Sequence, residues 1–314
     1  MISGIECIAC VGSGLIGQGW ATIFAVNGYD VVMQDIDEKV LEDAEKRVGA
    51  HISTLYEAGL AEDEDTPLER VAITQSLEEA VSEADFVQES VYESYEVKRP
   101  LFSEMDSLAP REVILASSTS GLKMTNIARD MERYPGRALV AHPWNPVHLV
   151  PLVELCPGEK TRQETVDITY NLMEDIGRVP VKLRKEVPGF IANRLSAALW
   201  REALDLVDRG VASVEDVDKA VMAGPGIRWA IMGPYLTYHL GGGSGGIEYL
   251  MRHIGVKKEE WLKTMAKWTR TPESAIQKAI EGVNEMIGDK SVGELEAWRD
   301  EHLISLNKLL WRDG

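Results

Sequence analysis

Residues 6–17, ECIACVGSGLIG, decide the fold, because an apolar run passes directly into a GxGxxG motif. ECIACVG (6–12) predicts a short buried strand, and residues 15–29 continue with the periodicity of a helix. A second apolar run, YDVVMQD (29–35), ends in Asp35. Strand, glycine turn, helix and a second strand ending in an acid together are typical of a dinucleotide-binding Rossmann unit.

Each glycine of the motif has a separate structural role. Gly12 permits the tight turn after the strand, Gly14 lets the backbone approach a pyrophosphate, and Gly17 lets the helix pack closely. Leu15 and Ile16 open the helix, whose N-terminal N–H groups and positive dipole end favour phosphate. The motif therefore predicts a cofactor site.

Asp35 indicates which cofactor binds. Its carboxylate is placed to accept hydrogen bonds from the adenosine ribose, and it would repel the 2′-phosphate of NADP. We therefore expect NAD. The alternative is a glycine turn in a sheet protein that binds no cofactor.

The rest of the chain divides into two parts with different patterns of apolar residues. Further apolar runs at 84–91, 112–118, 137–143 and 177–183 alternate with helical segments, including one from about 38 to 58, and 61–67 reads as an acidic loop. This alternation predicts an α/β fold with a doubly wound parallel sheet. After residue 186 the pattern is helical. We expect a Rossmann-type NAD-binding domain over 1–186 and a mainly helical substrate and dimerisation domain over 187–314.

Composition excludes several classes of function. The chain has 314 residues, 45% of them apolar, and a formal net charge of −18. That charge disfavours nucleic acid and anionic membrane surfaces. The sequence contains no apolar run of about 18 residues, the length that would suggest a membrane span. Cys7 and Cys10 form a CxxC without a second pair at zinc spacing, so we expect structural cysteines, no metal, and a cytoplasmic protein with reduced thiols.

His142 and Glu154 predict the chemistry. Both lie in the strand-like stretch AHPWNPVHLVPLVEL (141–155), where a buried strand would not ordinarily carry them. Oxidation of a secondary alcohol needs a base near neutral pH, which an imidazole provides, and a carboxylate behind it stabilises the imidazolium. Alternatives are a structural role for His142, and His148 as the base.

The chain resembles the 3-hydroxyacyl-CoA dehydrogenase family over nearly its full length. The resemblance rests on GSGLIG, ESVYESYEVK, SSTSGL, HPWNPVHLVPLVEL and EVPGFIANRL, in that order. It implies that Ser120 contacts the reacting oxygen, that Asn193 contacts the substrate, and that Glu93 and Lys98 lie near the nicotinamide ribose. The alternatives are a helix N-cap for Ser120, a hinge cap for Asn193, and a solvated charge pair for Glu93 and Lys98.

The substrate is expected to be a small 3-hydroxy acid. The acidic segment AEDEDTPLER (61–70) stands where the acyl-CoA members use basic residues, and the stretch from 224 to 255 resembles the branch that oxidises carnitine or gulonate. We expect L-carnitine, then L-gulonate, then a 3-hydroxyacyl-CoA. A trimethylammonium group binds over aromatic faces. The candidates for these faces, with an arginine for the carboxylate, are Trp144, Trp229, Tyr235, Tyr238 and Arg228.

These candidates also have a plainer interpretation. Aromatic side chains at helical spacing commonly form a core or a subunit interface, and Arg228 could form an interface salt bridge. The family resemblance implies a homodimer built through the second domain. A non-catalytic, crystallin-like protein that retains NAD binding is the alternative from a different class.

Overall fold

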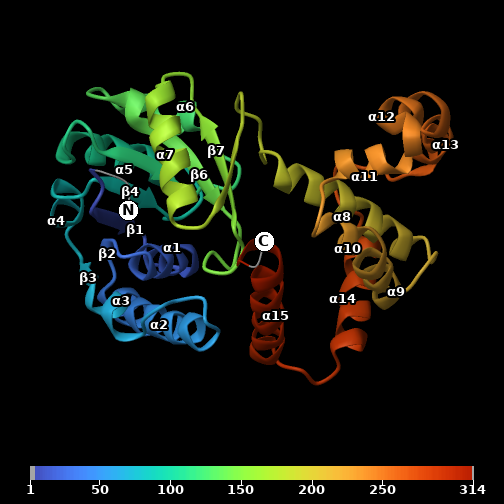
Figure 1. Cartoon of the computed structure of the whole chain (residues 1–314), viewed down its shortest axis with the longest axis horizontal. Coiled ribbons are helices and arrows are strands. Elements are labelled where there is room, and N and C mark those ends of the chain that lie inside the picture. The colour runs from blue at the N-terminus through green and yellow to red at the C-terminus, as the bar shows by residue number, and fades with distance from the viewer. Residues whose placement is uncertain (1–3, 313–314) are drawn as a thin grey trace. The chain divides into compact units, whose positions relative to one another are not determined.

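Eight strands form one sheet in the computed structural model, which describes residues 4–312 (Figure 1). Their order across the sheet is β3-β2-β1-β4-β5-β6-β7-β8. The strands are β1 (Cys7–Val11), β2 (Asp30–Gln34), β3 (Val71–Thr74), β4 (Phe86–Glu89), β5 (Ile114–Ser117), β6 (Ala138–Pro143), β7 (Leu152–Pro157) and β8 (Val179–Lys182).

The doubly wound α/β fold with a mostly parallel sheet is confirmed, and one strand pairing departs from the parallel arrangement. The first six strands pair in parallel, whereas β7 pairs antiparallel with β6, and β8 runs parallel to β7. Only residues 144–151 separate β6 from β7. A parallel crossover needs a dozen residues or more, so this short connection returns the chain in the opposite direction.

The sheet creates a crevice at its topological switch point. From central β1 the chain builds outward to β2 and β3, then crosses to β4 on the other side of β1. Connections that leave in opposite directions open a crevice at the carboxyl ends of the strands, where nucleotides bind. In the same register row at these ends lie Gln34, Val11, Glu89 and Ser117.

Helices cover both faces of the sheet (Figure 1). One core joins the sheet to α1 (Leu15–Val26), α2 (Glu38–Glu57) and α7 (Gln163–Asp175), and includes Trp20, Phe24, Leu41 and Met173. The other joins it to α4 (Leu77–Ser82), α5 (Tyr95–Leu108) and α6 (Met124–Ile127). Two short 3₁₀ turns, η1 (Ala128–Asp130) and η2 (Pro135–Arg137), follow α6.

The acidic segment 61–67 was expected to be a loop, and this is wrong for its second part. Asp65–Glu69 form the short helix α3. Pro67 does not prevent this, because it lies in the first turn, where its missing N–H would have no intrahelical partner.

The chain forms two compact units, and the boundary falls within a helix. Within residues 4–312, the first unit contains the chain up to Asn193 and also Asp300–Leu309, while the second contains Arg194–Arg299 and residues 310–312. In the first unit Asn307 Nδ2 donates to the carbonyl of Leu149 over 2.6 Å. The end of α15 therefore belongs to the sheet-bearing unit.

The second unit is helical. Its α-helices are α8 (Ala192–Asp208, which begins in the first unit), α9 (Val214–Val221), α10 (Ile227–Trp229), α11 (Pro234–Gly241), α12 (Gly246–Tyr249), α13 (Val256–Thr264), α14 (Glu273–Ile287) and α15 (Val292–Asn307, which ends in the first unit). Between them lie η3 (Met222–Gly226), η4 (Gly243–Gly245) and η5 (Leu250–Ile254), and η6 (Lys308–Arg312) follows α15 across the boundary between the units. Within residues 4–312, no helix is both long and apolar enough to span a membrane.

Candidate active site

The glycine turn after β1 has the shape that a dinucleotide requires. Gly12 adopts φ +92°, and a Cβ there would lie 2.7 Å from the backbone carbon of Ser90. A Cβ on Gly17 would lie 1.9 Å from the Gly12 carbonyl oxygen. By contrast, a Cβ on Gly14 would meet nothing within 4 Å. The first two positions exclude a side chain, and the third leaves the backbone open to a ligand.

The neighbouring polar groups fit the same ligand. Gly14 is the N-cap of α1 and provides no side-chain cap for the first-turn N–H groups carried by Leu15 and Ile16. Asp35 lies directly after β2, and its Oδ2 accepts a hydrogen bond from Ser13 N over 2.9 Å. An uncapped helix N-terminus, which favours anions, and a carboxylate held in place after β2 are therefore present together.

His142 and Glu154 face each other across the antiparallel β6–β7 pair. They are register partners, and His142 Nδ1 lies 2.9 Å from Glu154 Oε2. His142 is 6% exposed and Glu154 is fully buried. The carboxylate therefore occupies Nδ1 and leaves Nε2 as the nitrogen that can receive a proton from a substrate.

The second oxygen of Glu154 is held by the main chain at the start of α8. Oε1 accepts hydrogen bonds from the N–H groups of Ile191 (2.8 Å) and Ala192 (2.9 Å). Burial alone raises the pKa of Glu154, but the hydrogen bonds from His142, Ala192 and Ile191 outweigh it and lower the pKa. The pair therefore has a carboxylate that is ready to stabilise an imidazolium.

A strained turn presents these two N–H groups. Phe190, which directly precedes them, adopts φ +50°, a left-handed conformation that non-glycine residues seldom occupy. Its side chain is 1% exposed, and its ring centroid lies 5.5 Å from that of His142. Burial of this ring beside the imidazole holds the turn in place.

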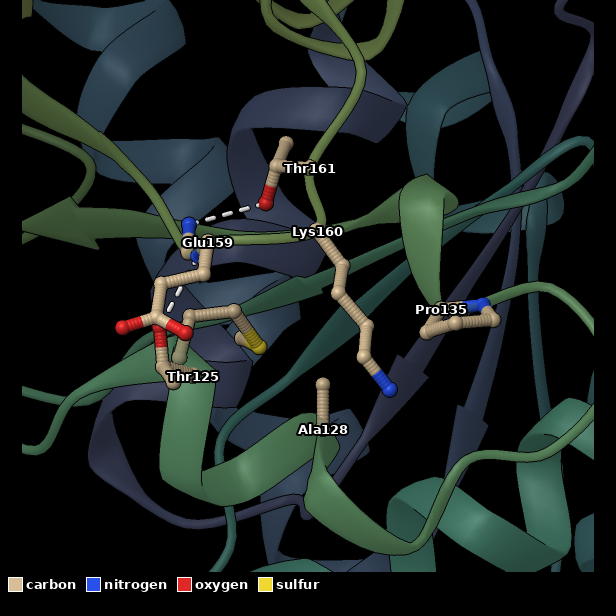
Figure 2. A pocket seen from close by; sticks show the side chains of 8 residues that line it. Thr125, Ala128, Pro135, Glu159, Lys160 and Thr161 are labelled. Carbon is tan, nitrogen blue, oxygen red and sulfur yellow. Dashed lines mark hydrogen bonds between the residues drawn. The ribbon is translucent and has the colours of Figure 1, made fainter.

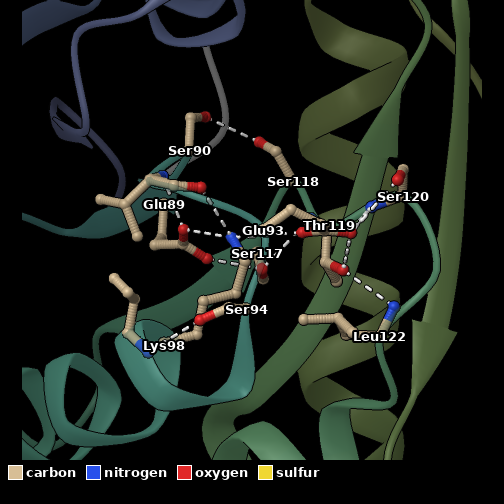
Figure 3. Close-up of polar contacts among 12 residues, drawn as sticks. Glu89, Ser90, Glu93, Ser94, Lys98, Ser117, Ser118, Thr119, Ser120 and Leu122 are labelled. Atoms are coloured by element: carbon tan, nitrogen blue, oxygen red, sulfur yellow. Dashed lines mark hydrogen bonds and ion pairs between the residues drawn. The ribbon is translucent and has the colours of Figure 1, made fainter.

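Ser120 and Asn193 meet in the structure. Asn193 Nδ2 donates to the carbonyl of Ser120 over 2.9 Å, while Glu93 Oε1 accepts from both Ser120 N (2.8 Å) and Ser120 Oγ (3.1 Å). Thr119 Oγ1 donates to the same carboxylate oxygen over 2.7 Å (Figure 3). The helix N-cap alternative for Ser120 is wrong, since the N-cap of α6 is Lys123.

Lys98 lies in the interior rather than in solvent. It is 1% exposed, and its Nζ lies 2.6 Å from Glu89 Oε1 and 3.6 Å from Glu93 Oε2 (Figure 3). The alternative of a solvated Glu93–Lys98 pair is therefore wrong. Lys98 contacts Glu93 from within the protein.

Two groups at this site were not anticipated. Glu89 is fully buried at the end of β4, although the run ADFVQESV (84–91) signals it by placing a carboxylate inside an apolar strand. The backbone donors of Ile191 and Ala192 carry no such signal, because any residue supplies a main-chain N–H.

The aromatic candidates for substrate binding are divided between the units. Trp144 follows β6 in the first unit, and its indole Nε1 is buried with no acceptor within hydrogen-bonding distance among residues 4–312. The other candidates lie in the second unit, with Arg228 and Trp229 on α10 and Tyr235 and Tyr238 on α11. All four of these are exposed on the isolated chain, so the alternative that the aromatics Trp229, Tyr235 and Tyr238 form a core is wrong.

His148 has a different environment from His142. It lies beyond the end of β6, is 8% exposed, and its ring stacks on that of His51 at a centroid distance of 4.0 Å. Glu154 pairs with His142 and not with His148. The geometry therefore favours His142 as the base.

A small pocket elsewhere on the first unit contains none of the expected site residues (Figure 2). It lies between α6 and the turn after β7, and the Lys160 side chain extends across it toward Ala128 and Pro135. Gly158 N donates to Thr161 Oγ1 over 2.8 Å at its rim. The polar contacts at this pocket join main-chain N–H groups to threonine hydroxyls of the protein itself.

A dinucleotide turn with an acid after β2, together with a buried histidine–carboxylate pair, defines an NAD-dependent dehydrogenase. The chain belongs to the 3-hydroxyacyl-CoA dehydrogenase family. The family's NAD-binding domain matches residues 7–187, and its C-terminal domain matches residues 189–282.

Similar proteins cover almost the whole chain. An L-carnitine dehydrogenase of Bacillus cereus is 42% identical, with 98% of this chain and 93% of the relative aligned. One from Streptomyces coelicolor is 39% identical over 99% of this chain and 96% of the relative. Among solved structures, an NAD-dependent 5-formyl-3-hydroxy-2-methylpyridine 4-carboxylic acid 5-dehydrogenase has a TM-score of 0.83 at 29% identity, covering 99% and 100% of the two chains.

Proposed function

We propose that this chain oxidises the 3-hydroxyl of L-carnitine with NAD, giving 3-dehydrocarnitine, NADH and a proton. The observation that carries this proposal is the similarity to L-carnitine dehydrogenases from several bacteria, at 39–42% identity over 96–99% of this chain. The buried His142–Glu154 pair supplies the base that such an oxidation needs.

Each polar group has a task in the proposed reaction. His142 Nε2 accepts the hydroxyl proton, and the Glu154 carboxylate stabilises the imidazolium that forms. Ser120 and Asn193, which hold each other in place, position the reacting oxygen. A bound nicotinamide supplies the acceptor for the hydride that leaves C3. Asp35 and the Gly12–Gly17 turn retain the dinucleotide.

We further propose that aromatic side chains bind the trimethylammonium group. Trp144, Trp229, Tyr235 and Tyr238 supply electron-rich faces, each worth about 0.5–2 kcal/mol. Arg228 pairs with the substrate carboxylate through a bidentate contact. Replacing one of these aromatics with Leu then raises the KM for carnitine while the affinity for NADH stays constant.

The decisive experiment compares three substrates in parallel. NADH formation is measured with L-carnitine, L-gulonate and L-3-hydroxybutyryl-CoA, with NADP replacing NAD as the cofactor control. Turnover that is highest on carnitine supports the proposal. Turnover that is higher on gulonate or on the thioester overturns the substrate assignment, but it leaves the dehydrogenase class and the His142–Glu154 pair intact.

We propose that the protein is a homodimer that associates through its second unit. Apolar side chains of α8 and α14 are exposed on the isolated chain, and they include Leu195, Leu199, Trp200, Ile276, Ile280 and Val283. Apolar surface of this extent favours a protein partner. Light scattering on the wild type and on Trp200→Glu tests this, since the variant should become monomeric.

The proposed compartment is the cytoplasm. The three cysteines are free thiols, and two of them, Cys10 and Cys156, are buried. Free thiols of this kind fit a reducing compartment. Fractionation of the source cells, with activity on carnitine as the readout, tests the proposal.

A further inference from the structure

A fully buried carboxylate, Glu89, lies behind the site and takes no part in the proposed reaction. Its Oε1 accepts from Lys98 Nζ (2.6 Å) and from Val91 N (2.7 Å), and its Oε2 accepts from Ser117 Oγ (2.6 Å). Ser117 is its register partner on β5. One carboxylate thus ties together the ends of two strands and the loop that follows β4.

The ammonium of Lys98 carries this arrangement toward the site. Its Nζ donates to Glu89 and to the carbonyl of Val91 (3.1 Å), and it lies 3.6 Å from Glu93 Oε2. Three acceptors therefore surround an ammonium that has three hydrogens. With 1% exposure, Lys98 has little freedom to turn elsewhere.

Glu93 is where this buried chain of contacts reaches the surface. Its side chain is 40% exposed, in contrast to those of Glu89 and Lys98. Oε2 faces the ammonium, while Oε1 receives Thr119 Oγ1 and both donors of Ser120. Figure 3 shows the sequence of contacts from Glu89 through Lys98 and Glu93 to Ser120.

We propose that Glu89 is a positioning residue, which acts through Lys98 to set the Glu93 carboxylate and, with it, the Thr119–Ser120 turn against the bound dinucleotide and substrate. Without the Glu89 charge, the buried ammonium has Glu93 as its only carboxylate partner among the described residues and draws that side chain inward. Glu93 then releases Ser120. The inference depends on NAD binding and not on the identity of the substrate.

The test begins with Glu89→Gln, which keeps the shape and removes the charge. We expect the Kd for NADH, measured by fluorescence titration, to rise about tenfold, as for one lost charged contact. The melting temperature should also fall by about 5–10 °C, because a buried charge loses its partner.

A matched control separates positioning from general stability. Asp106 and Arg137 form a second buried ion pair in the same unit, with the N–O distance 3.0 Å, and Asp106 lies toward the other end of α5 from Lys98. Asp106→Asn should lower the melting temperature comparably and leave the Kd for NADH within about twofold of wild type. An unchanged Kd in Glu89→Gln, with the same loss of stability, would overturn the proposal.

A double-mutant cycle tests whether Glu89 acts through Glu93. In a Glu93→Gln background, Glu89→Gln should change the Kd for NADH by less than about twofold, because the coupled side chain is already neutral. Full additivity of the two changes contradicts the proposed route. If Glu89→Gln does not fold, it is made in a Lys98→Met background, where neither buried charge remains. With no ammonium to draw Glu93 inward, Glu89→Gln should there change the Kd for NADH by less than about twofold relative to Lys98→Met, and a larger change contradicts the route through Lys98.

Discussion

His142 and Glu154 lie directly opposite each other on two antiparallel strands, so this buried pair depends on a single cross-strand register. Side chains opposite each other in such a pair lie on the same face of the sheet. The 2.9 Å contact between Nδ1 and Oε2 follows from this register, and the depth of both strands in the sheet excludes water. The reversal of β7 therefore brings the Glu154 carboxylate to the His142 imidazole.

Replacing His142 with Ala should abolish turnover without releasing the cofactor. Loss of a general base costs about 10²–10⁴-fold in kcat. The glycine turn and Asp35 are unaffected, so the Kd for NADH should stay within about twofold of wild type. Steady-state kinetics and fluorescence titration check this. Retention of activity would show that His142 is not the base.

Glu154→Gln should inactivate the enzyme through the wrong tautomer. If the amide oxygen keeps the N–H groups of Ile191 and Ala192, the amide NH₂ faces His142 Nδ1. The ring proton then lies on Nε2, which can no longer accept one from the substrate. We expect kcat to fall about 10³–10⁴-fold with little change in NADH affinity. A kcat within tenfold of wild type contradicts this role.

Asp35→Asn should weaken the preference for NAD over NADP. The neutral amide no longer repels a 2′-phosphate and forms weaker hydrogen bonds to the ribose. We expect kcat/KM for NAD to fall about tenfold while that for NADP rises. Initial rates with both cofactors give the ratio. An unchanged ratio of kcat/KM between NAD and NADP would mean that another group distinguishes the two cofactors.

Gly17→Ala should cost both stability and cofactor affinity. The new methyl group would lie 1.9 Å from the Gly12 carbonyl oxygen, so the turn must shift. We expect a loss of about 1–3 kcal/mol in the free energy of unfolding, measured with urea. Gly293→Ala is the matched control, since its Cβ meets nothing within 4 Å in α15. That change should be neutral or stabilise by up to about 1 kcal/mol.

His51 should make the stability depend on pH. Burial lowers the pKa of His51 from its ordinary value of 6.5, with Asp300 opposing this and Arg47 adding to it. The unfolded chain then binds the proton more tightly, so stability is lost as the pH falls below about 6.5. His51→Phe keeps a ring against His148. It should reduce the difference in melting temperature between pH 7.5 and 5.5, as measured by circular dichroism.

The Rossmann half could be predicted because its signals are local. The turn from Gly12 to Gly17 and the acid at Asp35 lie within one βαβ unit, where sequence spacing fixes spatial neighbours. The direction of β7 could not be predicted from apolar periodicity, which is the same in either direction. Only the length of the 144–151 connection contains that information.

The buried network behind the site was harder to foresee. Glu89 ends a strand and Lys98 lies in the first turns of the following helix, so their contact depends on how α5 packs on the sheet. A charged pair nine residues apart has no characteristic spacing in sequence. The sequence therefore left a solvated Glu93–Lys98 pair open as an alternative, and only the burial of Lys98 excludes it.

One of the two carboxylate oxygens of Glu154 is held by main-chain donors alone. The N–H groups of Ile191 and Ala192 hold Glu154 whatever side chains those positions carry. Homologues can therefore drift at these two positions without altering the acid, with proline as the exception because it lacks the donor. Selection at positions 191 and 192 should therefore exclude proline and leave every other residue type free to vary with the substrate.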